Sequence, residues 1–157
     1  MQVKIQNQNI LITGATGGIG RSIVKSFDGD NNNLLIIGTN ENKLNALSQE
    51  LKSSTKYLAC DFNDYRNVKK ITTKINEELD NKIDILINNA GITRDNLTLR
   101  MKEEEWNSVI NLNLSTTFFL TKEILRFMVK NRFGRIINIS SVVGSSGNVG
   151  QANYAAS

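Results

Sequence analysis

The sequence predicts an α/β protein with a Rossmann-like, doubly wound parallel sheet. Short apolar runs alternate along the chain with longer segments of helical periodicity, and a glycine-rich turn follows the first apolar run. Repeated β-α-β units of this length have right-handed crossovers, which favours a sheet of about five strands in the order 3-2-1-4-5. A sheet with this order has a topological switch point between its first and fourth strands, where ligands bind.

The apolar runs are continuous, as expected of parallel strands that are buried on both faces. They cover residues 10–13, 34–38, 57–60, 83–88 and 135–140. Helical periodicity predicts one helix that begins at Gly18 and further helices over residues 41–51, 65–79 and 103–131. Another helix is predicted to start at residues 153–157. In the third helix, the residues expected to face the sheet are Val68, Ile71, Ile75 and Leu79.

The composition is that of an ordinary globular protein, and it excludes several classes of site. Of the 157 residues, 39% are hydrophobic and 22% charged, and no apolar run approaches the roughly 20 residues needed to cross a bilayer. Residues 1–9 lack the build of a signal peptide, so we expect a cytoplasmic protein without membrane association. The single cysteine rules out an internal disulfide, and the absence of histidine excludes a His-based triad. We expect no metal site.

The net charge of +4 comes from Lys and Arg residues that are scattered along the chain. No basic run is interleaved with aromatic residues, so nucleic-acid binding is disfavoured. An acidic protein partner and a phosphorylated cofactor explain the charge equally well. Cys60 is expected to be a small buried apolar residue and not a reactive thiol. The aromatic residues expected in the core are Trp106, Phe118 and Phe119.

The glycine-rich turn after the first strand is the first candidate site. It consists of Gly14, Ala15, Thr16, Gly17, Gly18, Ile19 and Gly20. Gly14 allows a sharp turn off the strand, whereas Gly18 and Gly20 leave room for a pyrophosphate and for tight helix packing. The helix that follows offers unpaired N–H groups and the positive end of its dipole to phosphates. The turn therefore predicts a dinucleotide site, and a tight turn that binds nothing is the alternative interpretation.

The residues after the second strand favour NADP(H) as the cofactor. A site that prefers NAD usually places a carboxylate there, which binds the ribose 2′-OH and repels a 2′-phosphate. Here the strand is followed by Thr39 and Asn40. We expect Thr39 to hydrogen-bond the 2′-phosphate and Arg21 to assist. Asp61, at the end of the third strand, suits a hydrogen bond from the adenine amino group, and a helix cap is its alternative role.

The glycine turn has the spacing Gly-x-x-x-Gly-x-Gly, and Asn-Asn-Ala-Gly stands at residues 88–91. With these motifs the chain resembles the short-chain dehydrogenase/reductase family, and its second half is similar in particular to the bacterial 3-oxoacyl-[acyl-carrier-protein] reductases. The run Asn-Asn-Ala-Gly-Ile-Thr-Arg-Asp at residues 88–95 is similar to the end of the family's fourth strand. The same holds for residues 134–144 and for Gly-Gln-Ala-Asn-Tyr-Ala-Ala at residues 150–156. The resemblance covers essentially the whole chain.

The resemblance implies a catalytic set of Asn113, Ser141 and Tyr154. In the family, the tyrosine gives its proton to the carbonyl oxygen while hydride from NADPH reaches the carbonyl carbon, and the serine hydroxyl holds the same oxygen. The asparagine supports a water molecule that refills the proton relay. From the residues alone, Ser140 and Ser141 are equivalent candidates, and the family pattern selects Ser141.

The resemblance also implies the cofactor contacts and the partners. Besides Gly14 to Gly20, the expected cofactor-binding residues are Thr39, Asp61, Phe62, Asn88, Ala90, Gly91 and Tyr154. Arg132 matches a basic position that meets the acidic acyl carrier protein, which carries the 3-oxoacyl substrate for fatty-acid biosynthesis. The intact enzyme is expected to be a homotetramer.

One element of the family pattern lies outside the sequence. The family's lysine follows the tyrosine by four residues, and position 158 is beyond Ser157. We therefore expect residues 1–157 to be the N-terminal part of an NAD(P)-binding domain whose C-terminal portion is missing, and to be inactive alone. The alternatives are a non-catalytic, truncated dinucleotide-binding module and a family member that acts on another alcohol or ketone.

Overall fold

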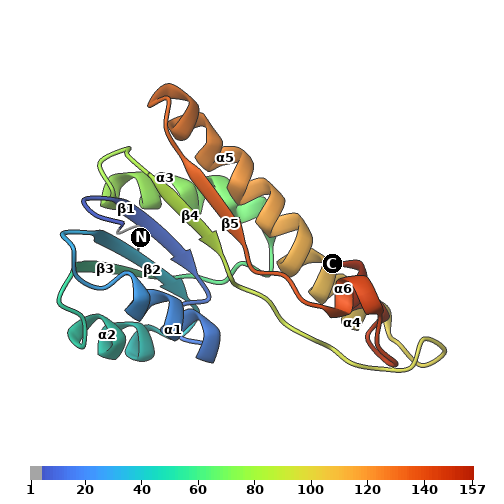
Figure 1. The fold of residues 1–157 in the computed structure, drawn as a ribbon. Helices are drawn as coiled ribbons and strands as arrows, with labels where there is room; N and C mark the ends of the chain where they lie inside the picture. Colours follow the sequence, from blue (N-terminus) through green and yellow to red (C-terminus); the bar gives the residue numbers. More distant parts are fainter. Residues whose placement is uncertain (1–4) are drawn as a thin grey trace.

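A parallel five-stranded sheet of order β3-β2-β1-β4-β5 forms the centre of the protein in a computed structural model, which describes residues 5–157 (Figure 1). The strands are β1 (Asn9–Thr13), β2 (Asn33–Gly38), β3 (Ser54–Ala59), β4 (Ile85–Asn88) and β5 (Arg135–Asn138). The α-helices are α1 (Gly18–Ser26), α2 (Glu41–Gln49), α3 (Val68–Glu78), α4 (Glu103–Val109), α5 (Thr117–Lys130), α6 (Val143–Ser146) and α7 (Ala152–Ala156). The predicted fold class and strand order are confirmed.

Two hydrophobic clusters hold the helices against the two faces of the sheet. Successive side chains of a strand point to opposite faces. Accordingly, Leu11 of β1 packs in the cluster that contains the buried faces of α3 and α5, whereas Ile10 and Ile12 pack with α1 and α2. Figure 1 shows the same layering, with α1 and α2 on one side of the sheet and α3 and α5 on the other. No helix within residues 5–157 is long and apolar enough to span a membrane.

The outer strands differ from the prediction that every strand is buried on both faces. In β3, exposed residues occur among partly buried ones, and most residues of β5 are exposed. Each of these strands has one neighbour in the described sheet, whereas β1, β2 and β4 each have two. β3 also begins earlier than predicted, because the ladder with β2 extends to the pair Asn33 and Ser54, both of which are polar.

The long helix predicted over residues 103–131 is interrupted by a π-helical segment, η2 (Ile110–Thr116), between α4 and α5. Asn113 lies within this segment, and its side chain exchanges two hydrogen bonds with the backbone of Ile92. π-Helical turns inside α-helices are often found at functional sites. Periodicity alone did not predict this interruption, because the apolar spacing continues through it.

Only one of the three aromatic residues predicted in the core packs there. Phe119 contacts the core cluster and stacks on Tyr65, with 5.0 Å between ring centroids. Phe118 and Trp106 are 61% and 39% exposed, so the prediction was wrong for these two. The buried stripe of α5 consists of Leu120, Ile124 and Met128, and Phe118 lies outside that face.

Replacing Ile124 by alanine is expected to lower the free energy of unfolding by about 2–5 kcal/mol, because its fully buried side chain would leave a cavity. Lys122→Ala in the same helix is the control, since Lys122 is exposed and surface changes usually stay within about 0.5 kcal/mol. Urea denaturation followed by circular dichroism measures both. Equal losses for the two variants would contradict the assignment of the buried face.

Candidate functional site

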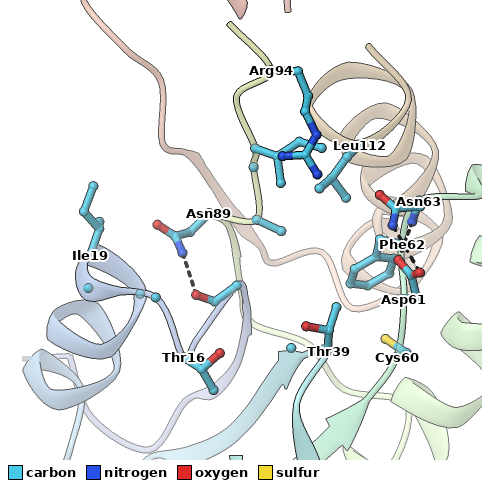
Figure 2. Close-up of a pocket in the computed structure, with 18 residues that line it drawn as sticks. Thr16, Ile19, Thr39, Cys60, Asp61, Phe62, Asn63, Asn89, Arg94 and Leu112 are labelled. Carbon is cyan, nitrogen blue, oxygen red and sulfur yellow. Dashed lines mark hydrogen bonds between the residues drawn. The ribbon is translucent and has the colours of Figure 1, made fainter. Parts of the chain in front are cut away.

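Two adjoining hollows lie at the carboxyl ends of the strands, around the switch point between β1 and β4. The first has a volume of about 450 Å³ and is formed by the glycine turn, the ends of β2 and β3, and the segment after β4 (Figure 2). The second, of about 560 Å³, lies between the segment after β4, the η2 segment and the residues after β5. The hollows share Ile19, Asn89, Ala90, Gly91 and Ile92, so they form one continuous groove.

The glycine turn is shaped by its contact with the segment after β4. Gly14 has a φ of +65°, and a Cβ there would lie 2.8 Å from the Cα of Ala90. A Cβ on Gly20 would overlap the carbonyl oxygen of Gly14. Both glycines are therefore required by the packing of the protein itself. A Cβ on Gly18, by contrast, would meet no atom within 4 Å, so Gly18 leaves open space beside the turn.

Asn89 and Thr13 join the turn to the fourth strand. The Nδ2 of Asn89 donates to the carbonyl oxygens of Thr13 and Gly14, each at 3.1 Å, and Figure 2 shows the bond to the turn. The Oγ1 of Thr13 accepts from the N–H groups of Asn89 and Ala90, each at 3.1 Å. Asn89 was not among the predicted site residues, although it stands inside the Asn-Asn-Ala-Gly motif.

Most of the predicted cofactor residues line the first hollow: Gly14, Thr16, Gly17, Gly18, Ile19, Gly20, Thr39, Asp61, Phe62, Ala90 and Gly91. Three others do not. Ala15 is fully buried in the core, and its N–H donates to Ile37. Asn88 and Tyr154 line the second hollow instead, and the buried side chain of Asn88 donates to Thr121 and Asn138.

The first hollow fits a dinucleotide by its shape and by its donors. The open space beside Gly18 leaves room for a phosphate group to contact the backbone of the turn. No side chain caps helix α1 at Gly17, so the N–H groups of the first helical turn remain available for a phosphate. Thr39 is exposed at the end of β2, and Asp61 is the one carboxylate among the described residues that line this hollow.

Arg21 does not lie as predicted, and a second arginine, for which no role was predicted, lines the hollow. The guanidinium of Arg21 bonds both carboxylate oxygens of Glu50 at 2.6 Å, and Arg21 does not line the hollow. Hydrogen bonds from Arg21 and Lys25 lower the pKa of Glu50. Arg94, which belongs to the motif at residues 88–95, lines the hollow, and Figure 2 shows it across from Thr16 and Thr39.

Cys60 also lines the first hollow, where it is partly buried against the core. Burial, with a smaller contribution from the charge of Asp61, raises the pKa of its thiol to about 11. The nucleophilic form of cysteine is the thiolate. At neutral pH the side chain therefore remains a thiol, in agreement with the prediction that it is not reactive.

The second hollow brings Asn113, Ser141 and Tyr154 together, with Ser140 beside them. The Oγ of Ser141 accepts from the N–H of Val143 at 3.2 Å, which leaves its hydroxyl proton free to donate. A serine and a tyrosine hydroxyl in one hollow can bind and protonate a carbonyl oxygen.

Asn113 connects three parts of this hollow. Its Oδ1 accepts from the N–H of Ile92 at 2.9 Å, and its Nδ2 donates to the carbonyl of Ile92 and to the Oγ of Ser157, each at 3.0 Å. The hydroxyl of Ser157 in turn donates to the carbonyl of Tyr154 at 3.0 Å. Asn113 thereby ties the segment after β4 to the helix that carries the tyrosine.

Arg132 lies outside both hollows of the groove. It lies in the turn between α5 and β5, with a φ of +53°, and this turn is at the amino end of β5. The groove is at the carboxyl ends of the strands, and Figure 1 shows the two regions at opposite ends of β5.

Gly18→Ala is expected to weaken NADPH binding at least ten-fold while leaving the melting temperature within about 2 °C of the unchanged protein, because the added methyl group projects into the open space. Gly20→Ala is the matched variant, and it is expected to destabilise the fold, since its methyl group overlaps the turn. NADPH fluorescence titration and thermal denaturation measure the two effects. Unchanged affinity in the Gly18 variant would show that no ligand approaches the turn there.

Sequence comparisons place the chain among known proteins. A family profile described as short chain dehydrogenase matches residues 8–157. The chain is 48% identical over 146 residues to the 3-oxoacyl-[acyl-carrier-protein] reductase FabG of Escherichia coli K12. The aligned region covers 93% of this chain and 59% of that protein. It is 43% identical over 155 residues to the reductase of the same name from Rickettsia bellii, covering 99% of this chain and 62% of that protein.

A third relative, the FabG reductase of Vibrio harveyi, is 44% identical over 154 residues, which are 98% of this chain and 63% of that protein. The chain thus spans between 59% and 63% of the length of these relatives. The family profile, however, matches the chain from residue 8 to its last residue. The protein therefore belongs to the short-chain dehydrogenase family, which implies a nicotinamide dinucleotide as its cofactor.

Proposed function

We propose that the protein takes part in the NADPH-dependent reduction of 3-oxoacyl-[acyl-carrier-protein] to the 3-hydroxyacyl form, a step of fatty-acid biosynthesis. The observation that carries the proposal is the second hollow, where Asn113, Ser141 and Tyr154 line one cavity that continues into the dinucleotide hollow. The names of the relatives, at 43–48% identity, support this choice of substrate.

The hydroxyl groups of Tyr154 and Ser141 act on the carbonyl oxygen of the substrate. NADPH in the first hollow would supply the hydride for the carbonyl carbon. Negative charge then develops on the oxygen, and the Ser141 hydroxyl stabilises it by donating a hydrogen bond. The Tyr154 hydroxyl transfers its proton to the same oxygen, so that the product is a neutral alcohol.

Asn113 serves the reaction through its hydrogen bonds. Both hydrogens of its Nδ2 are used, by Ile92 and by Ser157. An amide oxygen has two acceptor sites, and the N–H of Ile92 occupies one of those on Oδ1. A water molecule of the proton relay would therefore bind this side chain by donating to the second acceptor site.

We propose that the acyl carrier protein meets Arg132 and that the active enzyme is a homotetramer. Arg132 lies at the other end of β5 from the groove of its own copy, and we propose that it serves the groove of another copy in the tetramer. Exposed apolar side chains in two places support association. Phe118, Leu125 and Val129 lie on α5, and Ile137 and Ile139 lie in and just after β5, each at least 40% exposed.

We further propose a preference for NADPH over NADH. No carboxylate among the described residues at the end of β2 lines the hollow. Thr16 and Thr39 both line it, and a Cβ on Gly38 would lie 3.3 Å from the Oγ1 of Thr16. A 2′-phosphate would accept hydrogen bonds there without meeting a like charge.

Thr39→Asp is expected to raise the KM for NADPH at least ten-fold and to change the KM for NADH less than three-fold, because the new carboxylate repels the 2′-phosphate. The comparison is made by initial rates with both cofactors, and Thr39→Asn is the control that adds similar volume without charge. Equal effects of Asp and Asn on NADPH would place the 2′-phosphate elsewhere.

Tyr154→Phe is expected to lower kcat for acetoacetyl-thioester reduction by about 10²–10⁴-fold, because it removes the proton donor and little volume. The dissociation constant for NADPH should change less than three-fold. Rates are followed by NADPH absorbance with the protein expressed at its natural length, and Tyr65→Phe is the control, since Tyr65 packs on Phe119 outside both hollows. An unchanged rate would refute the assignment of Tyr154. Reduction of other ketones but not of the acyl thioester would refute the choice of substrate.

A further inference from the structure

The structure assigns Asn153 as a positioning residue for Tyr154, an inference that rests on the proposed reductase function. Asn153 precedes the tyrosine and is fully buried, whereas Tyr154 is partly exposed in the second hollow. Its side chain does not line either hollow, so it has no contact with substrate or cofactor. Its role would be to hold the backbone from which the tyrosine side chain extends.

All the hydrogen-bonding groups of the Asn153 side chain meet backbone partners. The Nδ2 donates to the carbonyl of Arg94 at 2.8 Å and to the carbonyl of Glu105 at 3.1 Å. The Oδ1 accepts from the N–H of Tyr154 at 2.8 Å. The amide thus joins the tyrosine backbone to two segments that lie 59 and 48 residues earlier in the chain.

The tyrosine depends on such an anchor because its own helix is short. Helix α7 contains five residues, and a helix of that length is not stable without packing. The residues immediately before it are exposed from position 144 to position 149. Asn153 is therefore the fully buried attachment of the tyrosine segment to the interior of the protein, in addition to the bond between Asn113 and Ser157 at the end of α7.

The segment held by Asn153 also forms the wall of the cofactor hollow. Arg94, whose carbonyl Asn153 binds, lines the first hollow with its side chain. A neighbouring bond strengthens the link, because the N–H of Asn96 donates to the carbonyl of Gly150 at 2.8 Å. These two hydrogen bonds therefore hold the backbone of Tyr154 at a fixed distance from the segment that lines the first hollow.

Asparagine is the residue that satisfies all three partners at this site. Two carbonyl groups require donors and one N–H requires an acceptor, which is what a terminal amide supplies. Aspartate lacks the donors, leucine lacks all polar atoms, and alanine leaves three backbone groups without partners. An unpaired buried group is unfavourable, so each change should release the segment.

The test compares Asn153→Ala and Asn153→Asp with the control Asn107→Ala. Asn107 lies in the adjacent helix α4 but is exposed, and its amide reaches only the Glu103 carboxylate at 3.4 Å. In protein of natural length, either Asn153 variant should lower kcat at least ten-fold and change the NADPH dissociation constant less than three-fold. The solvent deuterium isotope effect on kcat should rise, because proton transfer from a displaced tyrosine becomes slower. The control should keep all three values.

Amide hydrogen exchange tests the same inference without any turnover. In the unaltered protein, the Tyr154 amide should exchange far more slowly than the amides of residues 144–149, and Asn153→Ala should remove this protection while Asn107→Ala keeps it. Rapid exchange of the Tyr154 amide in the unaltered protein overturns the proposal even if no Asn153 variant folds. So does a folded variant with kcat within two-fold of normal. If the unaltered protein reduces no acyl thioester, the proposed function fails, and the exchange data still decide the anchoring role.

Discussion

Beyond the end of the β1–β4 ladder, hydrogen bonds from side chains replace those between the strands. The geometry of the site depends on these side-chain hydrogen bonds. The pairing of β1 with β4 stops at Ile12 and Ile87, and backbone groups beyond that point need other partners. Asn89 and Thr13 supply them with four hydrogen bonds between the two strand ends. The chain segments are thereby held so close that Gly14 has no room for a side chain.

Side-chain hydrogen bonds also hold the segment between β4 and α4, which contains no helix or strand. Asn113 binds both backbone groups of Ile92, and Asn153 binds the carbonyl of Arg94. Glu105 accepts from the backbone of Lys102 and from Asn96, and these two hydrogen bonds lower the pKa of Glu105. One irregular segment can therefore form part of the wall of the first hollow and of the second.

The sequence predicted what depends on local pattern. Apolar runs and helical spacing predicted the alternation of strands and helices, from which right-handed crossovers gave the strand order. The glycine spacing located the turn. These patterns lie in residues that are close together in the sequence. The partners of Asn89 lie up to 76 residues away, and those of Asn113 and Asn153 include backbone groups 21 and 59 residues away, so no local pattern marks these contacts. Phe118 was misplaced for a related reason: its aromatic character favoured burial, whereas its position outside the buried stripe of α5 decided its exposure.

The charges around the first hollow indicate how a phosphorylated cofactor would be selected. Arg21 is already paired with Glu50, so it can bind a phosphate only by exchanging one anion for another at an exposed position, where ion pairs contribute little. The backbone N–H groups at the start of α1 serve NADH and NADPH equally, since both contain the pyrophosphate. Thr39, at the end of β2, stands in the position at which a carboxylate would repel the 2′-phosphate, and Arg94 lines the opposite side of the hollow. The proposed preference for NADPH would therefore rest on the absence of a repelling charge at the end of β2 and on the positive charge of Arg94.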